Sequence, residues 1–178
     1  MRAVFTNLIS KHMNAKLFLL LALVSLSATA QKEGASLKTS SPIPEYGEAI
    51  TLDNAKKILK AAEAFATGNQ WTVVIAIVDT GGNLVLVEKL DQTQIGSIEI
   101  AIGKAKTAIN FKRPTKVLED AVANGGLGLR LLAVPGVFPL EGGELILSNG
   151  KIIGAIGVSG MQSTQDAEVA KAGLAALK

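Results

Sequence analysis

Cationic side chains that could bind an anion are the most chemically informative residues of this chain. Lys89 follows an apolar segment, Lys104 lies in an alanine-rich helical pattern, and Arg113 immediately precedes Pro114. A guanidinium at the entrance of a helix suits a carboxylate or a propionate, because its planar donors match the two oxygens. The three residues could together hold a small organic acid, and each could also form an ion pair at the surface.

Residues 154–161 place a hydroxyl and a thioether at the end of a glycine-rich apolar segment. Glycines inside a strand, here Gly154 and Gly157, allow another backbone or a ligand to approach closely. Ser159 is a candidate ligand contact rather than an activated nucleophile, since no histidine is available to activate it. Met161 either fills a gap in the core or ligates a soft metal or a haem iron.

Two carboxylates, Asp79 and Asp91, could act as the general base of a small isomerase or hydrolase. Asp79 stands just before Gly81 and Gly82, so capping a turn is its simpler role. Asp166 falls near the expected N-terminal end of the last helix, where the helix dipole stabilises a carboxylate. We therefore rank catalysis by a carboxylate below ligand binding.

Histidine and cysteine are absent from the chain downstream of a predicted leader, since the single histidine is His12. These side chains are the usual activators of nucleophiles and the usual ligands of soft metals. A Ser-His-Asp triad, a Cys-His pair and a zinc site are therefore excluded from the mature protein. Chemistry must come from carboxylates, lysines, hydroxyls, Met161 or a bound cofactor.

The N-terminal residues predict a signal peptide over 1–30, with Met13 as an alternative start. Lys16 precedes the apolar segment Leu17 to Leu26, and residues 27–30 fit a small-x-small cleavage pattern. We expect cleavage after Ala30 and a periplasmic or secreted protein. The alternative is a membrane anchor, but ten residues are short of the roughly 20 that span a bilayer. We therefore expect no stable membrane anchor after cleavage.

The leader also accounts for the positive net charge of the chain. It holds three of the 18 basic residues and no acid, which leaves 15 basic residues against 15 acidic ones. A neutral domain without a basic run gives no reason to expect a nucleic-acid partner. Residues 31–49 are rich in serine, glycine and proline and predict a flexible linker. Residues 50–178 are long enough for a single domain with one core.

Alternating apolar and turn residues indicate four helices and four strands in this domain. Asn149-Gly150 is the strongest hairpin signal, and Thr51 and Ser163 are candidate helix caps. We expect helices at 51–67, 97–110, 115–123 and 163–177, strands at 71–78, 84–88, 145–148 and 151–158, and irregular but packed chain at 127–143. The order α-ββ-α-α-ββ-α favours an α/β protein of the α+β type, with helices packed on an antiparallel sheet.

A series of short motifs runs in a fixed order from Thr51 to Leu177. The first half holds Ala76-Ile77-Val78-Asp79-x-Gly81-Gly82-x-Leu84, Lys89-x-Asp91, Ala101-x-x-Lys104-Ala105-x-Thr107-Ala108 and Phe111-x-Arg113-Pro114-Thr115. The second half holds Gly142-Gly143, Asn149-Gly150, residues 153–160 and Gln165-Asp166-x-x-Val169-Ala170. Each motif alone is weak, but together they resemble the haem-degrading, GlcG/HbpS-like family.

The resemblance implies a profilin-like domain with an antiparallel sheet of about five strands, in a homo-oligomer. Some exported relatives bind haem, and haem degradation and sensing are attributed to them. This chain differs in having Lys89 where arginine is common, and in having no histidine for iron. Arg113 or a lysine would then contact a propionate, with Met161, Tyr46 or a lysine at the iron.

We expect an exported haem- or tetrapyrrole-binding accessory protein that assists haem degradation or sensing. Any degradation would be driven by the cofactor, because the chain shows no acid–base machinery. An alternative is a binder or sensor of a small organic acid, with Lys89, Lys104 and Arg113 around the strand end at Gly157 and Ser159. Asp91 is also among the residues that we expect to contact the ligand. A small carboxylate-dependent isomerase using Asp79 or Asp91 ranks below both.

Overall fold

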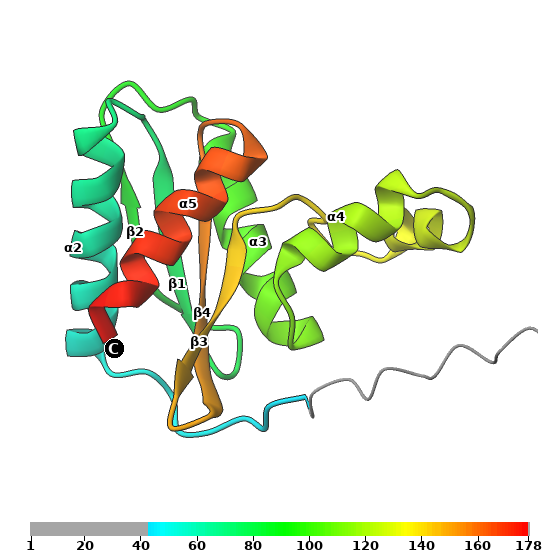
Figure 1. The fold of residues 1–178 in the computed structure, drawn as a ribbon, viewed down its shortest axis with the longest axis horizontal. Coiled ribbons are helices and arrows are strands. Elements are labelled where there is room, and N and C mark those ends of the chain that lie inside the picture. Colours follow the sequence, from blue (N-terminus) through cyan, green and yellow to red (C-terminus); the bar gives the residue numbers. More distant parts are fainter. Residues whose placement is uncertain (1–42, 178) are drawn as a thin grey trace, which may run out of the picture. The chain divides into compact units, whose positions relative to one another are not determined.

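The computed structural model describes residues 43–177. The predicted signal peptide and residues 31–42 of the predicted linker lie outside the described residues. The elements are α2 (Leu52–Gly68), β1 (Val74–Asp79), β2 (Leu84–Lys89), α3 (Ser97–Phe111), α4 (Thr115–Ala123), the 3-10 helix η1 (Gly126–Ala133), β3 (Gly143–Ser148), β4 (Lys151–Ser159), α5 (Ser163–Leu174) and the 3-10 helix η2 (Ala175–Leu177). Their order confirms the predicted α-ββ-α-α-ββ-α arrangement (Figure 1).

The strands form one antiparallel sheet in the order β2-β1-β4-β3. This gives four strands within residues 43–177, where the family resemblance led us to expect about five. The position beside the start of β4 is instead filled by a single parallel bridge between Tyr46 and Ile152. Gly47 N donates to Ile152 O at 2.7 Å, and Ile152 N donates to Glu45 O at 2.8 Å. This end of the predicted linker 31–49 is thus hydrogen-bonded to the sheet, which corrects its expected flexibility there.

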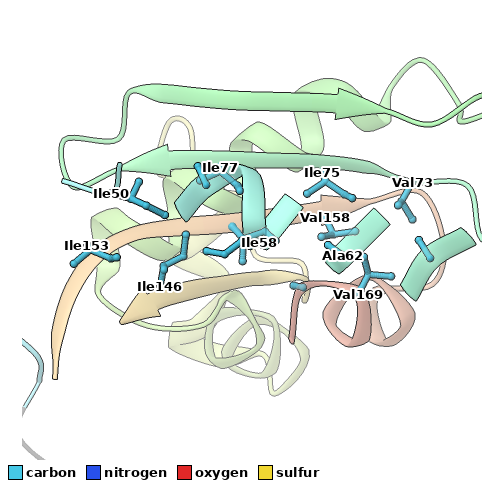
Figure 2. Close-up of a cluster of buried hydrophobic side chains, with 14 residues drawn as sticks. Ile50, Ile58, Ala62, Val73, Ile75, Ile77, Ile146, Ile153, Val158 and Val169 are labelled. Atoms are coloured by element: carbon cyan, nitrogen blue, oxygen red, sulfur yellow. The ribbon is translucent and has the colours of Figure 1, made fainter. Parts of the chain in front are cut away.

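Strand β1 is buried on both faces, as its unbroken apolar sequence predicts. Successive side chains of a strand point to opposite faces. Val73, Ile75 and Ile77 pack in one cluster with α2 and α5, whereas Val74, Ala76 and Val78 face α3. Figure 2 shows the larger cluster, in which side chains of α2 and α5 meet those of the strands. Helices α2 and α5 therefore lie on the opposite face of the sheet from α3.

Helix α3 lies close to the sheet because small residues face each other. Its sheet-facing side chains include Ala101, Ala105 and Ala108. A Cβ atom at Gly157 of β4 would lie 2.6 Å from Ala105 N and closer still to Ala101 O. Of the two roles that the sequence leaves open for Gly157, close approach of another backbone is the one seen.

The helix starts agree only in part with the expected caps. Thr51 Oγ1 accepts a hydrogen bond from Asn54 N at 3.3 Å, which confirms Thr51 as the cap of α2. Helix α5 is capped by Gln162 rather than by Ser163. A capping box joins Gln162 and Gln165, whose amide side chains bond to the backbone reciprocally. The longer glutamine side chain thus takes the role that we assigned to the serine hydroxyl.

Residues 127–143 differ from the packed loop that we expected. Helix η1 packs against α4, and both extend to one side of the strands in Figure 1. A Cβ atom at Gly128 would overlap Ala121 O, so the contact with α4 is made by backbone. Most leucine side chains of η1 are therefore not needed for this contact and remain exposed to solvent; Leu127 is 74% exposed. Within residues 43–177, no helix is long and apolar enough to cross a bilayer.

Candidate functional site

Four of the predicted site residues lie at one end of the sheet. Val74 of β1 is opposite Lys89 on one side and opposite Ser159 on the other. Lys89, Val74 and Ser159 thus form a row across β2, β1 and β4, with neighbouring strands about 4.8 Å apart. Asp91 follows Lys89 by two residues and Met161 follows Ser159 by two. We call this group, Lys89, Asp91, Ser159 and Met161, the strand-end site.

Ser159 is buried and bonded within the protein, so it is not an accessible nucleophile. Its Oγ lies 3.3 Å from Ser97 Oγ at the start of α3, and Gln94 Nε2 donates to that same Ser97 oxygen at 3.0 Å. Both serines are buried. The hydroxyls therefore tie the segment before α3 to the end of β4, which fixes the inner wall of the strand-end site.

Met161 presents its side chain at the surface of this end of the molecule. It is 37% exposed, while its backbone N–H donates to Asp166 Oδ1 at 3.0 Å. The backbone is therefore fixed while the thioether is accessible to a ligand. The core-filling role that the sequence left open does not describe this position.

Lys104 is buried and paired, which the sequence did not reveal. Its Nζ lies 2.8 Å from Asp166 Oδ2 and 2.9 Å from Val158 O, and both side chains are 2% exposed. Burial raises the pKa of Asp166, against the opposite effects of Lys104 and of hydrogen bonds from the Met161 and Gly160 amides. The predicted anion contact of Lys104 is thus made with an acid of the same chain.

Arg113 lies far from the strand-end site. Helix α3 begins beside Ser159 and spans 15 residues, about 22 Å, before Arg113. Arg113 is exposed, and its Nε donates to Phe111 O at 3.0 Å. One copy of the chain therefore does not bring Lys89, Lys104 and Arg113 together around a single small acid.

The alternative iron ligand Tyr46 is engaged elsewhere. Its hydroxyl donates to Ile109 O at 2.7 Å, and Lys112 Nζ lies 4.2 Å from the ring centroid. The phenol thus fastens the N-terminal segment to the end of α3. Among residues 43–177, no group of three histidine, cysteine, aspartate or glutamate residues could hold a metal ion.

Asp79 caps a turn, as its sequence context predicts. Its Oδ1 accepts hydrogen bonds from Gly81 N at 2.8 Å and from Asn83 N at 2.9 Å. Burial raises the pKa of Asp79, but hydrogen bonds from Asn83 and Gly81 outweigh it, so the net pKa is below the usual value. A carboxylate held ionised by its own turn is poorly suited to act as a general base near neutral pH.

Glu88 of β2 is one of the carboxylates that the sequence offers, but the sequence assigns it no role. Burial, followed by the nearby charge of Glu63, raises its pKa above the usual value. Its Oε1 is buried without a hydrogen-bond partner. Glu88 is paired with Ile75, so it points to the α2 face, away from the α3 face of Lys89. It therefore lies outside the strand-end site. The only sequence signal for this separation is that successive side chains of a strand point to opposite faces, so Glu88 and Lys89 cannot share a face.

Three surface hollows lie at the other end of β3 and β4. One of about 180 Å³ is lined by apolar side chains, namely Leu145, Ile146, Leu147, Leu174 and Leu177. The other two surround the hairpin turn at Ser148, with Asn54 and Lys57 on one side and Gly47 and Glu48 on the other. Met161 lines none of the three, so they are separate from the strand-end site.

Comparison with known proteins assigns this architecture to a family. A family model described as "Haem degrading protein HbpS-like" matches residues 50–175. An uncharacterised 15.0 kDa protein of Citrobacter freundii, from the dhaT-dhaS intergenic region, is 39% identical over 127 residues, which cover 70% of this chain and 89% of that protein. Protein GlcG of Escherichia coli K12 is 40% identical over 105 residues, covering 59% of this chain and 77% of GlcG.

Solved structures of the same family share the fold. The crystal structure of HbpS is 32% identical with a TM-score of 0.68, and the match covers 74% of this chain and 92% of that one. The crystal structure of a PduOC:haem complex is 31% identical with a TM-score of 0.67, covering 72% of this chain and 94% of that one. The similarity therefore extends over nearly the whole of each solved domain.

Proposed function

Because this chain belongs to the haem-degrading HbpS-like family, we propose that it is an accessory protein that binds haem or a related tetrapyrrole. The observation that carries the proposal is the similarity to PduOC, a domain solved in complex with haem, over 94% of that domain. The TM-score of 0.67 between the two folds supports the proposal that this chain has a counterpart of the haem-binding surface of PduOC.

The donor set of the described residues fits haem at the strand-end site. Histidine, cysteine, methionine and tyrosine are the usual protein ligands of haem iron. Residues 43–177 contain no histidine or cysteine, and the Tyr46 hydroxyl is already bonded to Ile109 O. Met161 is the remaining member of this set in the described residues, and its thioether is accessible. Lys89 at the same end would contact a propionate.

Bound haem would supply redox chemistry at its iron, and an external oxidant, either peroxide or dioxygen with a reductant, would drive any degradation. The residues of this chain bind and orient rather than transfer protons. Asp166 fixes the backbone of Met161, and the Ser97–Ser159 contact fixes the adjoining strand end. We therefore propose binding, with a role in haem degradation or sensing, rather than acid–base catalysis.

A haemin titration of residues 31–178, followed in the Soret region, tests this function. We expect saturable binding with a defined stoichiometry, a changed band in Met161→Ala and weaker binding in Lys89→Ala. Arg113→Ala is the matched control, because Arg113 lies at the far end of α3. A band that only follows haemin aggregation would contradict haem binding. A Soret band that Met161→Ala leaves unchanged would still support haem binding but would show that Met161 is not the iron ligand.

The small-acid alternative receives less support from the geometry. It requires Lys89, Lys104 and Arg113 around one anion, but Lys104 is paired with Asp166 and Arg113 lies beyond the other end of α3. If small carboxylates raised the unfolding temperature of the protein and haemin did not, the small-acid function would be favoured over haem binding.

Export is a further part of the proposal. The apolar segment Leu17 to Leu26 and the small residues before Gln31 support a cleaved leader. Mass spectrometry of the protein recovered from the periplasm or the medium tests it. We expect a mature N-terminus at Gln31, and an intact Leu17 to Leu26 segment in the recovered protein would contradict cleavage.

Assembly into a homo-oligomer also belongs to the proposal. Residues 115–134 include α4 and η1, and they expose several apolar side chains: Val117, Leu127, Leu129, Leu132 and Val134. Apolar side chains gathered on one exposed segment are typical of a protein–protein contact. We propose that this segment, here called the α4–η1 segment, contacts a second copy of the chain.

A further inference from the structure

The carboxylate of Asp166 holds the short segment that carries Met161. Its Oδ1 accepts a hydrogen bond from Met161 N at 3.0 Å, and the Gly160 backbone amide donates to the same carboxylate. Its Oδ2 accepts from Lys104 Nζ at 2.8 Å. One buried side chain therefore joins the end of β4, the start of α5 and a lysine of α3.

The chain leaves space for this pair by means of a glycine. Gly142 has a φ of +119°, a conformation that other residues rarely adopt. A Cβ atom there would lie 3.0 Å from Lys104 Nζ and 2.9 Å from Asp166 Cβ. A side chain at this position would therefore crowd both members of the ion pair.

The other side of the segment is fixed by backbone. A Cβ atom at Gly160 would lie 2.7 Å from Val73 Cα and closer still to Thr72 O. Gly160 is therefore held between the residues preceding β1 and the carboxylate of Asp166. Because Gly160 is held in this way and Met161 N is bonded to Asp166, the position of the Met161 Cα is fixed. The Met161 side chain nevertheless remains accessible.

We infer that Lys104 and Asp166 are positioning residues, which hold residues 160–161 so that the Met161 side chain is presented to the ligand. The inference rests on the proposed function for the identity of the ligand. Neither residue touches the ligand, because both side chains are 2% exposed. Residues that orient a metal ligand from behind commonly change metal affinity by about 10- to 100-fold when they are replaced.

A buried ion pair need not be retained for stability alone. Replacing such a pair by apolar side chains of similar volume is often neutral or stabilising. Here Asp166 has a second task, because Oδ1 is the acceptor for the backbone of residues 160–161. An amide at this position would keep that acceptor without the charge, whereas an apolar side chain would remove it. The two functions can therefore be separated by substitution.

Two double variants make this separation. Lys104→Met with Asp166→Asn removes both charges and keeps an acceptor for Met161 N. Lys104→Met with Asp166→Leu removes the acceptor as well. We expect the first to bind haemin within about threefold of the wild type and the second to lose about tenfold or more. Adding Met161→Ala to the second should cause no further loss, because residues acting through one another are non-additive. Lys116→Met, at the exposed Lys116–Asp120 pair, is the control.

Amide hydrogen exchange tests the same inference without any ligand. In the wild type, the amides of Gly160 and Met161 should exchange as slowly as those of β4, although Met161 is exposed. In the Asp166→Leu double variant they should exchange rapidly while the amides of α3 stay protected. The wild-type measurement remains decisive if the variants do not fold.

The outcomes distinguish the two proposals. Rapid exchange at Met161 in the wild type would overturn the inference, as would wild-type haemin affinity in the folded Asp166→Leu double variant. An unchanged haemin affinity in Met161→Ala would also overturn it. If the wild type binds no haemin but the exchange results hold, the proposed function fails while Lys104 and Asp166 remain the residues that position this segment.

Discussion

Lys104 Nζ lies 2.8 Å from Asp166 Oδ2 and thereby joins two helices that cover opposite faces of the sheet. Helix α3 packs on the face of Val74 and Ala76, whereas α5 belongs to the cluster on the other face. The link passes the end of β4, where Lys104 also donates to Val158 O. It is therefore a tertiary contact of the whole domain and not a local helix cap.

Removal of Lys104 alone should destabilise the protein strongly. Lys104→Met leaves the Asp166 carboxylate buried without its cation, and breaking a buried pair in this way costs about 3–5 kcal/mol. Urea denaturation at pH 7 measures the loss. Lys116→Met is the control, because an exposed pair contributes about 0–1 kcal/mol. Equal losses in both variants would show that the buried pair contributes no more than the exposed one.

Glu88 should make the stability of the protein depend on pH. Its pKa is raised above 4.5 by burial and by Glu63, so the folded protein holds this proton more tightly than the unfolded chain. The free energy of unfolding should therefore fall as the pH rises from about 4.5 through the raised pKa. Glu88→Gln should reduce this slope, and Glu63→Gln should reduce it in part. Urea titrations between pH 4 and pH 7 measure both slopes, with Glu168→Gln on α5 as the control.

Gly157 should not tolerate a methyl group. Its Cβ atom would lie 2.6 Å from Ala105 N, so α3 would have to move away from the sheet. Overpacking against backbone typically costs about 1–3 kcal/mol or more. Thermal unfolding of Gly157→Ala measures the loss. Gly68→Ala is the matched control, because nothing lies within 4 Å of its added Cβ. A small effect of Gly157→Ala would show that α3 is free to shift.

The elements of this fold were largely predictable because each is specified by local residues. The unbroken apolar run of β1 indicated a strand buried on both faces, and Asn149-Gly150 indicated the β3–β4 hairpin, as observed. Asp79 was assigned to its turn from the two glycines that follow. Such signals lie within a few residues of one another, so they need no knowledge of tertiary structure.

The candidate site was less predictable because its contacts join distant parts of the chain. Lys104 and Asp166 are 62 residues apart, and no spacing rule relates them. A local signal for burial was present, since Lys104 shares a helix face with Ala101 and Ala108. The separation of Arg113 from Lys89 follows from the direction of α3, which only the tertiary structure gives. The exposed leucines of η1 were missed because backbone, not side chains, forms its contact with α4.

The α4–η1 segment should determine the oligomeric state. Leu127 and Leu132 are 74% and 63% exposed, so replacing them removes little packing from a single domain. An aspartate at either position would instead place a charge in the contact between copies, and burying an unpaired charge is costly. Leu127→Asp with Leu132→Asp should therefore lower the mass measured by light scattering to that of one chain, with unfolding of the monomer nearly unchanged. Leu52→Asp is the control, because Leu52 is an exposed leucine of α2, outside this segment. An unchanged mass in the double variant would place the contact between copies elsewhere, whereas a monomeric wild type would contradict assembly itself.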